Sequence, residues 1–149
     1  MRYVLLKSGD RDLARSLFAT MAAIFGEESQ APSDAYVDRL LAREDFFALA
    51  ALAGDRVAGG LTAYAIALTR RQASEVFIYD VAVRNEDRRK GIGRELVSAL
   101  RDVVSTKGCG DVFVLAENGD ADALNFYRSL GGVASPVTLF DFERPQGRR

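Results

Sequence analysis

Histidine and tryptophan are absent from this chain of 149 residues, which has one cysteine and three prolines. Without histidine, the sequence excludes a Ser-His-Asp triad, a histidine general base and any zinc site with a histidine ligand. Cys109 cannot form a disulfide within the chain, and we expect it to be a small turn residue rather than a nucleophile. Carboxylates and tyrosines remain as candidate acids and bases, and we expect no metal site.

Long apolar runs and an excess of one charge are also missing. No apolar run reaches the length of about 18 residues that marks a membrane span. The net charge of −1, with 28% charged residues, argues against general nucleic-acid binding. The N-terminus lacks a charged segment followed by an apolar one, so we expect a soluble, cytoplasmic protein without membrane or nucleic-acid partners. Its length and 48% hydrophobic content suit one domain, predicted over residues 1–149.

Residues 77–100 predict a strand, a basic loop and a long amphipathic helix. Aromatic and β-branched residues favour the strand, and apolar residues at helical spacing favour the helix. The loop between them reads Arg88-Arg89-Lys90-Gly91-Ile92-Gly93. Unpaired N–H groups and the macrodipole at a helix N-terminus favour an anion, and glycines allow close approach, so the loop predicts a pyrophosphate site. It fits neither a P-loop nor a dinucleotide fingerprint; a basic turn that caps a surface helix stays open.

The rest of the chain predicts a mixed, mostly antiparallel sheet with flanking helices. We expect strands at 2–7, 46–53, 57–68 and 111–116, and one or two closing strands within 133–143. Expected helices cover residues 13–25, a short segment capped by Ser33 or Asp34, residues 93–107 and residues 121–130, with Ser8 or Asp10 capping the first. Gly54-Asp55 predicts a hairpin, and Gly59-Gly60 a bulge or a close backbone approach. The fold class is therefore α+β.

Two motifs resemble the signatures of the GNAT superfamily of N-acetyltransferases. Arg88-x-x-Gly91-x-Gly93 is similar to the family's coenzyme A motif, and residues 123–131 resemble its A-x-x-[FL]-Y-x-x-x-G helix. Residues 31–36, 59–64 and 78–83 are most similar to the aminoglycoside 3-N-acetyltransferases within it. The resemblance implies the GNAT fold, with parallel strands 4 and 5 splayed apart and about four helices.

It also implies acetyl-CoA as the cofactor, with its pantetheine arm in the gap between those strands. The backbone of the fourth strand binds the arm, and an N–H at or near Val81 polarises the thioester carbonyl. The implied cofactor-binding residues are Val81, Ala82, Val83, Arg88, Arg89, Lys90, Gly91, Ile92, Gly93, Arg94, Asp120, Phe126 and Tyr127. Asp120 departs from the asparagine common in the family.

Attack of an amine on a thioester needs a base, because an aliphatic amine is mostly protonated at neutral pH. We expect Asp80 to be that base, because an acid within an apolar strand is uncommon without a task or a partner. Glu75 is the rival, and an ion pair of Asp80 with a nearby arginine is the structural alternative. Strand alternation places Glu75 on the other face from Asp80 unless a bulge intervenes. Tyr127 is the expected general acid by resemblance; a core aromatic is its alternative.

The resemblance implies acetyl transfer to the 3-amino group of an aminoglycoside, and hence antibiotic resistance. Such a polycation calls for acidic partners, although each alone can be an ordinary surface charge. The expected acceptor residues are Asp34, Tyr79, Asp80, Glu117, Asp141 and Glu143, with Glu27 and Glu28 as further candidates. A different amine acceptor (a polyamine, a small amino compound or a protein amine) and a non-catalytic acyl-CoA-binding domain stay open, as does a homodimer.

Overall fold

The computed structural model describes residues 1–28 and 30–145. These residues form parts of two compact units, Met1–Leu115 and Ala116–Arg149. The first unit holds the sheet and three of the helices described, and the second holds a single helix and the C-terminal segment. The expectation of one domain over residues 1–149 stays a prediction.

One five-stranded sheet organises the first unit. Its strands lie in chain order, and they are β1 (Arg2–Leu5), β2 (Phe46–Ala53), β3 (Arg56–Ala67), β4 (Ser74–Val83) and β5 (Val112–Val114). The first four strands pair antiparallel, and β5 pairs parallel to β4. The predicted α+β class with a mixed, mostly antiparallel sheet is confirmed.

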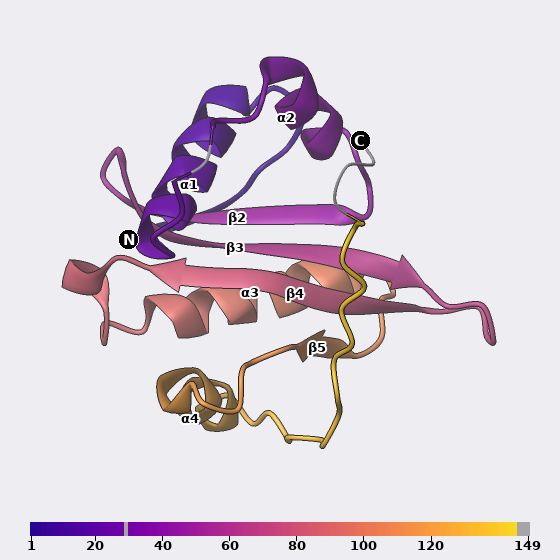
Figure 1. Cartoon of the computed structure of the whole chain (residues 1–149). Helices are drawn as coiled ribbons and strands as arrows, with labels where there is room; N and C mark the ends of the chain where they lie inside the picture. Colours follow the sequence, from indigo (N-terminus) through magenta and orange to yellow (C-terminus); the bar gives the residue numbers. More distant parts are fainter. Residues whose placement is uncertain (29, 146–149) are drawn as a thin grey trace. The chain divides into compact units, whose positions relative to one another are not determined.

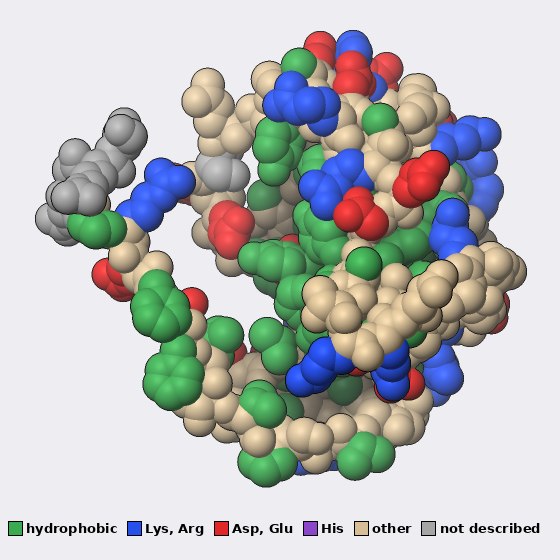
Figure 2. All heavy atoms as spheres, turned by 90° about the vertical axis from the view of Figure 1, so that its right-hand side faces the viewer, with side chains coloured by type: hydrophobic (Ala, Val, Ile, Leu, Met, Phe, Trp, Pro, Cys, Tyr) green, Lys and Arg blue, Asp and Glu red, His purple; other side chains and the backbone are tan. Residues whose placement is uncertain are grey.

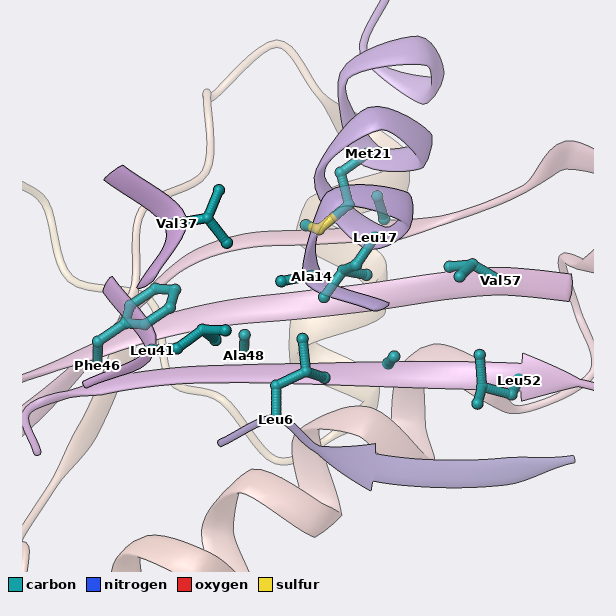
Figure 3. Packing of buried hydrophobic residues seen from close by; sticks show 12 residues of the cluster. Leu6, Ala14, Leu17, Met21, Val37, Leu41, Phe46, Ala48, Leu52 and Val57 are labelled. Atoms are coloured by element: carbon teal, nitrogen blue, oxygen red, sulfur yellow. The ribbon is translucent and has the colours of Figure 1, made fainter. Parts of the chain in front are cut away.

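Helices cover both faces of this sheet (Figure 1). The helices α1 (Arg11–Ile24) and α2 (Asp34–Leu41) lie on one face, and α3 (Ile92–Thr106) lies on the other. Residues of α1 and α2 such as Leu17, Met21 and Val37 pack against alternate residues of β2, including Ala48 and Leu52, as Figure 3 shows. The intervening residues of β2 face α3. Burial of both sheet faces explains why β2 is apolar at every position.

Gly60 allows α1 to approach the sheet closely. A Cβ at this position would lie 2.2 Å from Leu17 Cδ1 and 2.9 Å from the carbonyl oxygen of Leu49. A Cβ at Gly59 would lie 2.5 Å from the carbonyl oxygen of Ala82. The predicted close backbone approach at this pair of glycines is therefore confirmed.

The predicted helix caps differ in their outcome. The Ser33 hydroxyl accepts a hydrogen bond from Tyr36 N and caps α2 as expected. Asp10 precedes α1 but makes no side-chain cap; its carboxylate instead accepts a bond of 2.9 Å from Lys7 N. Asp10 therefore stabilises the turn that enters α1 rather than the first turn of the helix.

The second unit contains α4 (Ala121–Ser129), which ends at Leu130 before Gly131. The prediction of closing strands within residues 133–143 is wrong, because this segment has no regular secondary structure. Its apolar residues satisfy the strand pattern, but a strand also needs a neighbour to pair its backbone N–H and C=O groups. Within the described residues no ladder includes this segment.

Candidate active site

A β-bulge in β4 determines which way Asp80 points. Ala63 of β3 lies opposite Ile78, whereas Thr62 lies opposite Asp80, so Tyr79 is the extra residue. A bulge shifts the alternation of side chains by one position. Asp80 therefore lies on the same sheet face as Glu75, which pairs with Ile66, rather than on the opposite face. This is the α1 face of the sheet.

Beyond the bulge, β4 has a side that β5 does not cover. The parallel ladder runs only from Val76–Val112 to Ile78–Val114, while β4 continues to Val83. Arg84 N donates to Ala58 O of β3 at 2.9 Å. Because hydrogen-bonding direction alternates along a strand, the backbone of Ala82 also faces β3, and that of Val81 and Val83 faces away from it. The splayed strands expected here are thus present, with the backbone of Val81 directed to the open side.

The basic turn, residues 88–93, leads from the end of β4 into α3. It follows a short 3-10 helix, η1 (Asn85–Asp87), and begins with Arg88, whose Nε donates to Val83 O at 3.3 Å. Arg89 and Gly91 both have left-handed backbone conformations, with φ of 61° and 79°. Gly91 is the N-cap of α3, and no atom lies within 4 Å of a Cβ built there. The turn thus offers an exposed helix N-terminus with side-chain cations beside it, which suits a pyrophosphate.

Asp87 holds this turn in place. It is only 4% exposed, and its carboxylate accepts hydrogen bonds from Arg56 at 2.7 Å and Lys90 at 3.2 Å. These bonds, that from Arg56 above all, lower the pKa of Asp87. The ion pair with Asp87 also holds the ammonium group of Lys90 close to the backbone of the turn. Sequence reasoning missed Asp87, although an acid inside a run of arginines was a signal for an internal ion pair.

Asp80 is half-buried and has an unusual electrostatic environment. Burial, and secondarily the nearby charge of Glu27, raise the pKa of Asp80. Glu27 follows the C-terminus of α1 and is exposed. The alternative of an ion pair between Asp80 and an arginine finds no support, because no such pair occurs among the described residues. A carboxylate with a raised pKa is suited to general base work near neutral pH.

An open hollow of about 630 Å³ lies in the first unit next to the bulge. Three aromatic residues line it: Tyr64, Phe77 and Tyr79, whose neighbouring ring centroids are 5.6–6.3 Å apart. Asp45 lies at its rim, paired with Arg43 at 2.8 Å. Tyr79 is 63% exposed. Of these residues the sequence predicted only Tyr79; the register of β3 against β4 that gathers the others carries no sequence signal.

Asp34 is occupied by other partners. Its carboxylate pairs with Arg15 at 2.8 Å and Arg11 at 3.5 Å, which joins α2 to α1. These contacts support a structural role, and its acceptor role stays a prediction.

The remaining predicted residues lie in the second unit. Asp120 is the N-cap of α4, and its carboxylate accepts a bond of 3.0 Å from Ala123 N, so the carboxylate serves as a helix cap. Glu117 and Asp120 share an open acidic hollow with Asp122. Phe126 and Tyr127 are half-buried neighbours on α4, and Asp141 and Glu143 are exposed. The functional roles of all these residues stay predictions.

Comparison with known proteins agrees with this geometry. The model of the acetyltransferase (GNAT) family matches residues 13–131. The chain therefore belongs to the GNAT acetyltransferase family, and this membership supports acetyl-CoA as its cofactor. The residues of the basic turn and the open side of β4 fit that molecule.

Two solved structures resemble the whole chain. One is an aminoglycoside acetyltransferase, HMB0005, from an uncultured soil metagenomic sample; it is 32% identical, with a TM-score of 0.92, and the match covers 97% of this chain and 98% of that one. Another is the soil metagenomic aminoglycoside acetyltransferase meta-AAC0020 in complex with sisomicin, 27% identical with a TM-score of 0.90, covering 97% and 96%.

A curated relative has a different acceptor. The ribosomal protein bS18-alanine N-acetyltransferase of Salmonella typhimurium (strain LT2) is 31% identical over 104 residues, which are 70% of this chain and 66% of that enzyme. The match thus spans slightly less than two thirds of that relative. In the part of the chain that the structure describes, no helix is long and apolar enough to cross a membrane.

Proposed function

We propose that this protein transfers the acetyl group of acetyl-CoA to the 3-amino group of an aminoglycoside, and thereby confers resistance. The observation that carries the proposal is the bulge in β4. It turns Asp80 to the face beside the aromatic hollow while Val81 presents its backbone to the uncovered side of the strand. The base and the acyl-binding backbone are then adjacent residues.

Each of the site residues described in the first unit then has a definite task. Acetyl-CoA supplies the thioester that is attacked. The basic turn binds the pyrophosphate, Val81 and Val83 bind the pantetheine arm through their backbone, and the N–H of Val81 polarises the thioester carbonyl. Asp80 removes a proton from the ammonium group of the acceptor before or during attack. Tyr127 remains our candidate for the acid that protonates the leaving thiolate.

The charges and rings beside Asp80 favour a polycationic, ring-shaped acceptor. Glu27 and Asp80 place two carboxylates near each other on one side of the sheet, and a cation between them relieves their repulsion. The exposed ring of Tyr79 offers a flat face for a sugar ring or a cationic amine. The two soil aminoglycoside acetyltransferases support the same acceptor class.

A thiol-release assay tests this proposal. Acetyl-CoA is incubated with the protein and with sisomicin, gentamicin, spermidine or a peptide that begins with the N-terminus of bS18. We expect CoA release only with the aminoglycosides. CoA release only with the peptide or only with spermidine would show that the acceptor is a protein amine or a polyamine rather than an aminoglycoside. Acetyl-CoA binding without CoA release would indicate a non-catalytic domain.

A protein N-terminus is the second candidate acceptor, because the curated relative acetylates ribosomal protein bS18 by its name. A flexible peptide would need an extended groove with backbone partners. The aromatic hollow beside Asp80 is broad and open instead, which favours a compact ring-containing acceptor.

A further inference from the structure

Arg43 and Asp45 form an ion pair in the short segment between α2 and β2. Arg43 Nε donates to Asp45 Oδ1 at 2.8 Å, and Arg43 Nη2 donates to Asp45 Oδ2 at 3.0 Å, so both oxygens of the carboxylate are engaged. The carbonyl oxygen of Asp45 accepts a hydrogen bond of 2.8 Å from Ala65 N of β3. The sheet thus fixes the backbone of Asp45, and the hydrogen bond from Arg43 lowers the pKa of the Asp45 carboxyl group.

The guanidinium group of Arg43 also lies over an aromatic ring. Its carbon Cζ is 5.9 Å from the centre of the Tyr64 ring, which is within the range of a cation–π contact. The Tyr64 ring packs against those of Phe46 and Tyr79, with centroids 5.2 Å and 6.3 Å away. The positive charge of Arg43 therefore contacts a carboxylate and a ring face, the two kinds of group that bind an organic ammonium ion.

The ion pair between Arg43 and Asp45 can open at low cost. The two side chains are 51% and 50% exposed. Exposed ion pairs contribute little to folding, because water screens the charges and the paired side chains lose conformational freedom. A cation from solution can therefore take the place of the guanidinium group without unfolding any part of the sheet.

The pair lies in the aromatic hollow at a defined distance from the candidate base. Asp80 lies opposite Thr62 of β3, and Ala65, which binds Asp45, is three residues further along the same strand. Strand geometry then places the backbones of Asp80 and Asp45 roughly 14 Å apart. Figure 2 views this end of the sheet, where acidic and basic side chains lie next to hydrophobic ones.

We propose that Arg43 occupies, in the free protein, a subsite for a second ammonium group of the acceptor, and that this ammonium group displaces Arg43 from Asp45 and Tyr64. The inference rests on the proposed function, because it requires the reacting amine to lie at Asp80. The bound guanidinium group marks where the second cation goes, since it already makes both contacts that the cation would make.

The distance between Asp80 and Asp45 gives this subsite a role in specificity. An acceptor that reaches both carboxylates must extend over a span on the order of 10 Å or more, which a single six-membered ring does not cover. An acceptor with several amino-sugar rings covers it and carries a second ammonium group at the far end. Short amines gain nothing from Asp45, so the subsite favours polycations with several rings.

Titration calorimetry of sisomicin into the CoA-bound protein tests the displacement. We expect Arg43→Gln to bind sisomicin about 2–5-fold more tightly, because the internal competitor is gone, and Asp45→Asn to bind it about 3–10-fold more weakly. In the double variant Arg43→Gln/Asp45→Asn, the gain from removing Arg43 should disappear. Circular dichroism melts should be unchanged, since both side chains are exposed.

The control for general electrostatics is Arg39→Gln, which removes a positive charge from the exposed side of α2. We expect this variant to bind sisomicin like the wild type. An equal gain in Arg39→Gln and Arg43→Gln, or a gain from Arg43→Gln that persists in the Asp45→Asn background, would show simple charge repulsion and overturn the displacement.

Steady-state kinetics separates this inference from the function on which it rests. Neither Arg43 nor Asp45 touches the reacting atoms, so we expect the KM for sisomicin to change in both variants while kcat stays the same. A wild-type protein that acetylates sisomicin, with the same KM as both variants, would overturn the displacement alone. A wild-type protein that neither binds nor acetylates sisomicin would overturn the proposed acceptor and the displacement together.

Discussion

Asp80 of β4 lies opposite Thr62 of β3, one step out of register with the preceding pair of Ile78 and Ala63. This single extra residue, Tyr79, brings Asp80 to the same face as Glu75 and the aromatic hollow. Without it, the carboxylate would point towards α3 and the apolar side of the sheet. The bulge therefore makes the sequence position of Asp80 chemically useful.

Replacing Asp80 by asparagine should remove the base without disturbing the fold. We expect Asp80→Asn to bind acetyl-CoA with unchanged affinity and to lose a factor of about 10²–10⁴ in kcat. The matched control is Asp102→Asn, on the exposed side of α3. Near-normal turnover in Asp80→Asn, together with a large loss in Glu75→Gln, would assign the base to Glu75.

The pH dependence of the wild-type rate should report the same carboxyl group. The base must be deprotonated, and burial raises the pKa of Asp80 above its ordinary value of 3.8. We therefore expect kcat/KM to fall with acidification at a higher pH than an ordinary aspartate would give. An acidic limb that persists unchanged in the residual activity of Asp80→Asn would show that another group titrates.

A substitution at Arg89 can remove one positive charge from the basic turn and leave the backbone conformation of the turn unchanged. Its φ of 61° is left-handed, so Arg89→Gly keeps the conformation and removes the charge. We expect calorimetry to show about 5–30-fold weaker acetyl-CoA binding, the loss of one charge-assisted contact, with an unchanged melting temperature. Arg70→Gly, in the exposed loop before β4, is the control. Equal affinity in both variants would contradict a cofactor contact by Arg89.

Asp87 should couple the stability of the turn to pH. Hydrogen bonds from Arg56 and Lys90 lower the pKa of Asp87 in the folded state below the ordinary 3.8. The contribution of Asp87 to the free energy of unfolding is therefore complete above pH 3.8 and is lost as the pH falls through the folded-state pKa. Asp87→Ala should lower the melting temperature by several degrees at pH 7 and by less at pH 3, below the ordinary pKa of 3.8. Glu86→Ala is the control, because its carboxylate is exposed and lies 3.7 Å from Arg56. An equal loss at both pH values would argue against this role.

Gly60 should not tolerate a methyl group. The Leu17 side chain can move away from a Cβ at this position, but the carbonyl oxygen of Leu49, 2.9 Å away, belongs to a neighbouring strand. We expect Gly60→Ala to destabilise the protein by about 1–3 kcal/mol in urea unfolding. Gly119→Ala, where nothing lies within 4 Å of the added Cβ, should have little effect. Equal midpoints for the two variants would disprove the close approach.

Local sequence signals predicted most of the fold. The apolar run of residues 46–53 matches β2, the Ser33 cap matches α2, and the glycine-rich basic motif marks the start of α3. These features depend on residues close together in the chain. The prediction of closing strands within residues 133–143 was wrong, because strand pairing depends on a neighbouring strand, which local sequence does not specify.

The site was predictable only in part for the same reason. The spacing of Arg88, Gly91 and Gly93 identifies the turn, since its chemistry is contained in six consecutive residues. The bulge at Tyr79 and the approach of Glu27 to Asp80 arise from the packing of α1 and β3 against β4. Tyr64 and Asp45 reach the hollow from β3 and from the residue before β2, and nothing in their local sequence marks them.

The central claim is that the face beside Asp80 presents the 3-amino group of an aminoglycoside to the thioester. The most direct measurement is the mass and regiochemistry, by NMR, of the product formed from gentamicin and acetyl-CoA. We predict a single added acetyl group on the 3-amino nitrogen. Acetylation at the 6′-amino group would contradict the 3-amino claim while leaving acetyl transfer to aminoglycosides intact, and an unmodified drug would contradict the acceptor itself.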